Sequence, residues 1–135
     1  MARAVIPKGY ETAYETLRFA PGVVSNGHVF LTGMTGSGPD GQMPEDPETQ
    51  FQQAFEKIAG VLAEAGVDFA SVVELTSYHV GLRAHFDVFD AVRKRFVRPP
   101  YPAWTAVEVA GLRRPGALVE VKAIARMHPT GQETP

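Results

Sequence analysis

The strongest constraint on the fold is a regular apolar stripe between residues 47 and 65. Apolar side chains recur there at three- or four-residue intervals, which places them on one side of an α-helix: Phe51, Phe55, Ile58, Leu62 and Ala65. Asp46 suits the N-cap, Pro47 the first turn, and Gly66 the stop after the last turn. The stripe therefore predicts a helix over residues 47–65 with one face turned to a core.

A second helix and several strands complete the pattern. Residues 84–97 repeat apolar side chains at helical spacing, and Pro99-Pro100 ends that helix because proline cannot continue the hydrogen-bond ladder. Residues 117–127 alternate between apolar and polar side chains, which predicts a strand. Further strands are expected at 28–32, 72–80 and 103–109, with a weaker one at 18–24. The predicted order is β-β-α-β-α-β-β.

This order predicts an α+β fold in which both helices pack on one face of a single sheet. The other face of the sheet is then uncovered. The last strand carries a broad apolar surface formed by Val119, Val121 and Ala123. If this is the uncovered surface, the chain is expected to associate with itself, because monomers rarely expose a large apolar patch.

Length and composition exclude several classes of protein. The 135 residues suit one domain, 1–135, with a frayed tail over 128–135. The absence of cysteine excludes disulfides, thiolate zinc sites and a cysteine nucleophile. No segment resembles a signal peptide or approaches the roughly 20 apolar residues that span a bilayer, so we expect a cytoplasmic protein without a membrane partner. The net charge of −2 leaves no basic footprint for nucleic acid, and residues 93–98 are interpreted as a solvated helix end.

The polar side chains form no familiar cofactor or metal motif. Residues 33–41 lack the lysine of a phosphate-binding loop, and no serine lies in a nucleophile elbow, so no cofactor is predicted. Alternation places His79 on the same face as Val73 and Leu75, which favours a hydrogen-bonded core or interface histidine over a catalyst. No metal is predicted either, because metal-ligand spacing is missing among the histidines His28, His79, His85 and His128.

Several segments, in this order and spacing, resemble the RidA/YjgF family of reactive-intermediate deaminases, and in particular its YjgH-like branch. The resemblance runs from about residue 12 to residue 127, and its segments are Phe30–Met34, Val72–His79, Phe86–Val92, Pro99–Val109 and Gly116–Arg126. It implies a chorismate-mutase-like α+β fold with one mixed sheet. It also implies a homotrimer with three clefts between neighbouring subunits, each of which takes a small-molecule ligand.

In that family, an arginine pairs with the substrate carboxylate and a glutamate positions or activates water, so that enamines and imines are hydrolysed to keto acids and ammonia. The resemblance places Trp104 where the arginine is usual and Glu120 where the glutamate is usual. Tryptophan cannot pair with a carboxylate, and it offers a stacking surface instead. Read without the family, Trp104 is a core or interface aromatic and Glu120 a solvent-facing strand carboxylate.

At the remaining site positions that the resemblance implies, this chain again departs from the residues that are usual in the family. The tyrosine that closes the family's pocket corresponds to Phe19, so the hydroxyl is missing. The Ser-Gly turn corresponds to Thr32-Gly33, with Met34 where glutamine is usual. The helix asparagine corresponds to Asp90, and Tyr101 lies near Trp104 in a proline-flanked segment.

Three functions stay open on these grounds. The first is an imine or enamine hydrolase in which Glu120 guides water, acting on something other than 2-aminoacrylate. The second is a non-enzymatic trimer that binds a small ligand. The third, endoribonuclease activity, is disfavoured by the pI of about 6.1.

Overall fold

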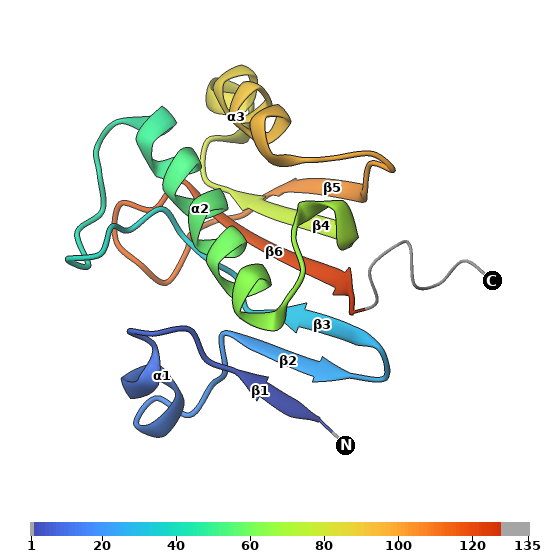
Figure 1. The fold of residues 1–135 in the computed structure, drawn as a ribbon. Coiled ribbons are helices and arrows are strands. Elements are labelled where there is room, and N and C mark those ends of the chain that lie inside the picture. The colour runs from blue at the N-terminus through green and yellow to red at the C-terminus, as the bar shows by residue number, and fades with distance from the viewer. Residues whose placement is uncertain (1, 128–135) are drawn as a thin grey trace.

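The computed structural model describes residues 2–127, whose six strands form one sheet. The strands are β1 (Arg3–Val5), β2 (Gly22–Ser25), β3 (His28–Leu31), β4 (Val72–His79), β5 (Ala103–Glu108) and β6 (Val119–Arg126). Their order across the sheet is β1-β2-β3-β6-β4-β5 (Figure 1). The sheet is mixed, because β4 and β5 run parallel whereas all other neighbours run antiparallel.

Two long helices, α2 (Pro47–Ala65) and α3 (Leu82–Phe96), cover one face of the sheet (Figure 1). Helix α2 has the bounds that the sequence predicted. The Asp46 carboxylate accepts the Thr49 N–H at 2.9 Å, and Gly66 ends the helix with a left-handed φ of 88°. The predicted stripe is buried, and Phe51 meets Phe89 of α3 edge-on with ring centroids 5.3 Å apart.

Helix α3 begins two residues before the predicted position, and the reason lies in a distant strand. The carboxylate of Glu108, at the end of β5, accepts the N–H groups of Gly81 and Leu82 at 3.1 and 2.7 Å. These backbone donors hold the pKa of Glu108 below its ordinary value. A negative charge at a helix N-terminus is stabilising, and sequence spacing gives no sign of a cap that arrives from another element.

Three short elements were not predicted: β1, helix α1 (Glu11–Glu15) and the 3₁₀ turn η1 (Phe69–Ser71). Each spans five residues or fewer, which is too short for periodicity to register. Helix α1 also buries none of its residues. The weaker predicted strand at 18–24 is observed as β2, which starts at Gly22.

The apolar surface of β6 is on the covered face of the sheet. Val119, Val121 and Ala123 are at most 1% exposed beneath the helices, whereas Glu120 and Lys122 alternate onto the uncovered face. The condition for self-association through that apolar surface is therefore not met.

One prediction about β4 is wrong. A register shift between Val72 and Glu74 interrupts the alternation, so Val73 is 38% exposed whereas Leu75 is fully buried. His79 shares its face with Leu75 but not with Val73.

A buried glutamine joins the long loop after β3 to the loop before β6. Gln50 Nε2 donates to the carbonyl oxygens of Pro44 and Gly116 at 2.7 and 2.9 Å, and its Oε1 accepts the Leu118 N–H at 2.9 Å. All three bonds are made by one side chain of α2, so both loops are fixed to the same helix. Among residues 2–127, no helix is long and apolar enough to cross a membrane.

Candidate functional site

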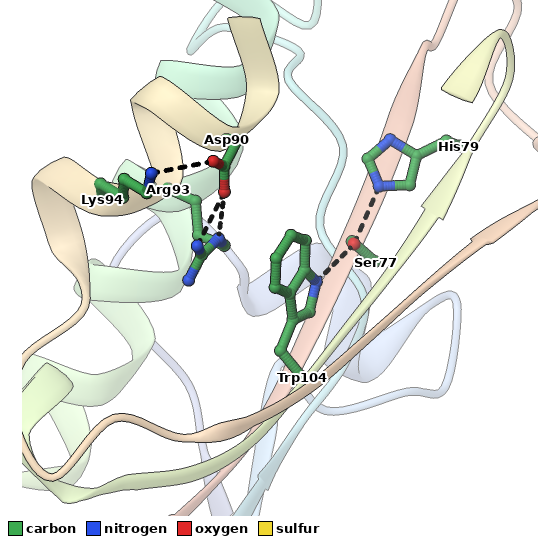
Figure 2. Close-up of polar contacts among 6 residues, drawn as sticks. All are labelled: Ser77, His79, Asp90, Arg93, Lys94 and Trp104. Carbon is green, nitrogen blue, oxygen red and sulfur yellow. Dashed lines mark hydrogen bonds and ion pairs between the residues drawn. The ribbon is translucent and has the colours of Figure 1, made fainter. Parts of the chain in front are cut away.

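Trp104 lies on β5 and is held against α3. Its partner in the parallel β4–β5 register is the core residue Leu75, so the indole lies on the helix-covered face. The indole stacks on Phe86 with ring centroids 5.9 Å apart at 10°, and contacts Phe89 at 6.2 Å. Its Nε1 donates to Ser77 Oγ at 3.0 Å (Figure 2). Trp104 is therefore fixed on three sides, yet remains only half-buried.

A guanidinium lies over the same ring. The Cζ of Arg93 is 4.0 Å from the centre of the Trp104 ring, within the range of a cation–π interaction. Asp90 Oδ1 accepts from Arg93 Nε and Nη2 at 3.1 and 2.7 Å, and Asp90 Oδ2 lies 3.1 Å from Lys94 Nζ (Figure 2). Hydrogen bonding from Arg93 is the main cause of the lowered pKa of Asp90. We call Phe86, Asp90, Arg93 and Trp104 the aromatic wall.

Ser77 links this wall to a buried histidine. His79 Nε2 lies 2.8 Å from Ser77 Oγ, and the imidazole meets Phe89 edge-on at 4.5 Å (Figure 2). His79 is 1% exposed, and burial lowers its pKa to about 4, against the opposing influence of the Glu108 charge. It is a neutral, hydrogen-bonded core residue at pH 7, as the sequence favoured.

Glu120 belongs to a second group of residues, on the other side of the sheet. It pairs with Tyr78 in the β4–β6 register and projects from the uncovered face. Gly33 lies against its side chain so closely that a Cβ at position 33 would be 2.8 Å from Glu120 Cδ. Met34, the next residue, exchanges two backbone hydrogen bonds with Val121 at 2.8 and 2.9 Å.

Thr32 completes this group. Its Oγ1 donates to the Ala20 carbonyl at 2.6 Å, and its N–H donates to the Pro21 carbonyl at 2.9 Å, so the turn is fixed to the segment before β2. We call Thr32, Gly33 and Glu120 the carboxylate wall. Phe19, one residue before Ala20, is 43% exposed.

One chain does not bring the two walls together. Trp104 and Asp90 lie on the helix side of the sheet, whereas Glu120 and Gly33 lie against the opposite face. Tyr101 is 69% exposed and is part of neither wall. Within residues 2–127, no group of three or more His, Cys, Asp or Glu side chains has the geometry to hold a metal ion.

Arg93 was missed by the sequence analysis, which treated residues 93–98 as a solvated helix end. That description suits Arg95, which is half-exposed and pairs with Glu48 at 2.6 Å. Arg93 has a side chain only 14% exposed. The three-residue spacing from Asp90 predicts the ion pair, but nothing local predicts the tryptophan beneath it.

Comparison with known proteins gives a consistent family. The sequence profile described as Endoribonuclease L-PSP matches residues 11–127. The RutC family protein YjgH of Escherichia coli K12 is 35% identical over 125 residues, covering 92% of this chain and 94% of that protein. The 2-iminobutanoate/2-iminopropanoate deaminase of Bos taurus is 30% identical over 113 residues, covering 82% of this chain and 81% of that one.

Solved structures give the same result. The structure of protein YJGH has a TM-score of 0.82 at 34% identity, and covers 95% of this chain and 98% of that one. A family member from Mycobacterium tuberculosis, Rv2704, has a TM-score of 0.78 at 25% identity, covering 93% and 99%. The YjgF-like fold that the resemblance implied is confirmed. With a profile match across residues 11–127 and relatives at 30% identity or more, this chain belongs to the RidA/YjgF family.

Proposed function

We propose that this protein is a Rid-type hydrolase of C=N bonds whose cleft forms between copies of the chain in a homotrimer. The aromatic wall of one copy would face the carboxylate wall of its neighbour. The separation of Trp104 and Glu120 on opposite sides of the sheet supports this, because one chain alone supplies only half of a site on each side.

The proposed substrate class rests on one observation, the fixed position of Trp104. The guanidinium expected at this strand position in the family is replaced by an indole whose ring contacts all come from α3. The nearby Arg93 is already engaged by Asp90 through two hydrogen bonds. The wall therefore lacks a free bidentate anchor for a small carboxylate and favours a flat, uncharged or aromatic imine.

Glu120 is proposed to act on water in this cleft. The carboxylate accepts a proton from the water that adds to the imine carbon and passes it to the nitrogen, which gives a carbinolamine. It then transfers the proton of the carbinolamine hydroxyl to the nitrogen as the carbonyl forms and ammonia leaves. Imine and water thus give carbonyl and ammonia, with no redox change. Gly33 allows the carboxylate to lie against the turn, where backbone groups and the ligand would meet.

The test is hydrolysis of two imines made in situ. One is 2-aminoacrylate from a dehydratase, and the other is an aromatic imine without a carboxylate, made from an arylalkylamine by an amine oxidase. We expect acceleration of the aromatic imine, lost in Glu120→Gln, and pyruvate release from 2-aminoacrylate well below that of an arginine-containing relative. Release at the relative's rate, or unchanged turnover in Glu120→Gln, would contradict the proposal.

A second candidate is a binding protein without turnover. The family resemblance places Phe19 and Trp104 at positions that are usually polar, and Phe19 is exposed enough to line a shared cleft. This candidate predicts a ligand that raises the melting temperature and changes the fluorescence of Trp104, the chain's single tryptophan, without being consumed. Consumption of that ligand at a rate dependent on Glu120 would favour the hydrolase instead.

A further inference from the structure

Two cations from distant segments meet at one serine hydroxyl, and none of the three residues belongs to either wall. Lys57 on α2 donates from Nζ to Ser37 Oγ at 2.9 Å. Arg114, in the loop before β6, places Nη1 3.4 Å from the same oxygen. Its Nη2 donates to the Gly41 carbonyl at 2.6 Å. The loop after β3 and the loop before β6 lie together beside α2 (Figure 1).

Neither cation has a carboxylate partner among residues 2–127. The ion pairs there involve Arg93, Lys94 and Arg95 as cations, and leave Lys57 and Arg114 without a counter-charge. Burial lowers the pKa of Lys57 to about 8, and the charge of Arg114 adds to that effect. Two neighbouring positive charges without an anion are costly, and this cost is removed when an anion binds.

The serine hydroxyl has one unused hydrogen-bonding function. Ser37 is 7% exposed, and its oxygen accepts from both cations, so its two lone pairs are occupied. Its proton has no acceptor within the described part of the chain. The cluster therefore presents an ammonium, a guanidinium and a hydroxyl, all donors. Lys57 and Arg114 remain partly exposed, so solvent reaches them.

The carboxylate nearest in sequence does not balance these charges. Asp40 Oδ1 accepts the Gln42 N–H at 2.9 Å, and Asp40 forms no ion pair with either cation. It lines a neighbouring surface hollow of about 450 Å³ with Gly38 and Gln53. Lys57, Ser37 and Arg114 do not line this hollow, so Asp40 and the cluster face different surroundings.

We propose that Lys57, Ser37 and Arg114 form a binding site for a phosphate dianion, either free or as the phosphoryl group of a small metabolite. The dianion matches the two positive charges, and its oxygens match the three donors. The site is separate from the residues assigned to imine hydrolysis, so either proposal stands without the other.

The test measures the melting temperature and calorimetric binding at constant ionic strength, with sodium phosphate, acetate or chloride as the varied salt. A sugar phosphate added alongside distinguishes a free phosphate from a phosphorylated metabolite. We expect phosphate to raise the melting temperature more than chloride or acetate does. Arg114→Gln and Lys57→Met should each weaken phosphate binding by roughly tenfold or more, the loss typical of a charged hydrogen bond.

Arg113→Gln is the matched control, since it removes a cation from the neighbouring, exposed position and should keep binding within about twofold. Equal stabilisation by phosphate, acetate and chloride would overturn the proposal. An equal loss of binding in Arg113→Gln and Arg114→Gln would also overturn it, because the effect would then be nonspecific charge. Lys57→Met gives a second, independent readout should Arg114→Gln disturb the loop.

Discussion

The guanidinium of Arg93 lies 4.0 Å from the centre of the Trp104 ring, and Asp90 fixes it there with two hydrogen bonds. A cation positioned over an indole in a partly buried site is worth about 1 kcal/mol. The pair joins α3 to the edge strand β5. It also means that the positive charge of the aromatic wall comes from a helix.

Trp104→Ala should lower the free energy of unfolding by about 2 kcal/mol. The variant loses the stacking on Phe86, the contact with Arg93 and the hydrogen bond to Ser77, while the half-buried site collapses only partly. Urea unfolding followed by circular dichroism measures the change. Tyr101→Ala, an aromatic deletion at a 69% exposed position nearby, is the control and should stay within about 0.5 kcal/mol. Equal losses in the two variants would show that the contacts of Trp104 contribute nothing.

His79 should make the chain sensitive to acid. Its pKa is about 4 in the folded state against 6.5 for an ordinary histidine, so the unfolded chain binds the additional proton between these values. The stability is complete above pH 6.5 and falls by about 3 kcal/mol as the pH drops to 4.

The measurement is the free energy of unfolding at steps between pH 7 and 4. His79→Leu should be less stable than the wild type at pH 7. Its free energy of unfolding should no longer show the fall of about 3 kcal/mol that His79 causes as the pH drops to 4. His85→Leu, which removes a histidine from a partly exposed position, is the matched control. A slope unchanged in His79→Leu would assign the acid sensitivity to other groups.

Two glycines of the same loop should respond differently to alanine. Neither has a positive φ, so the backbone accepts alanine at both positions. A Cβ at Gly36 would lie 2.6 Å from the carbonyl carbon of Gln50 in α2, which cannot move away, so Gly36→Ala should cost about 3 kcal/mol.

At Gly33 the obstacle is the Glu120 side chain, which can turn. Gly33→Ala should therefore cost under about 1 kcal/mol but displace the carboxylate, so that imine turnover falls by roughly tenfold. Both predictions can be checked by measuring thermal unfolding and imine turnover on the two variants. Full turnover in Gly33→Ala, or wild-type stability in Gly36→Ala, would contradict these packing assignments.

Lys57→Met should stabilise the chain in chloride buffer at neutral pH. The pKa of Lys57 is about 8 in the folded state against 10.5 ordinarily, so its charge opposes folding below pH 8. Between pH 8 and 10.5 the unfolded chain holds more protons, and wild-type stability rises with pH. The difference in the free energy of unfolding between variant and wild type should therefore become smaller between pH 8 and 10.5. Urea unfolding at several pH values measures this difference. Lys94→Met, which removes a lysine whose side chain is 67% exposed, is the matched control.

The sequence predicts the parts of the fold that depend on local periodicity. Helix α2 is found at its predicted bounds because its apolar stripe and both caps lie within the continuous segment 46–66. The start of α3 and the orientation of Val73 were wrong for non-local reasons: a cap from Glu108 and a bulge in β4.

In the candidate site, too, local features were predicted from the sequence and non-local ones were not. Glu120 and Trp104 were identified from short matching segments, but their placement on opposite faces follows from the register of three strands. The positions of Arg93 over the indole and of Arg114 beside Ser37 depend on tertiary packing across long sequence separations. Sequence spacing cannot predict such contacts, because their residues do not lie in the same helix or strand.

The cap that Glu108 provides has a consequence for how the aromatic wall responds to a ligand. Strand β5 is attached to α3 twice, through Glu108 at the helix start and through Trp104 along the helix side. Because of these two attachments, we expect a ligand that shifts the indole to carry the helix with it. In the proposed cleft, adaptation to ligands of different size would then come from the carboxylate wall, whose turn at Gly33 has room only while no side chain is added there.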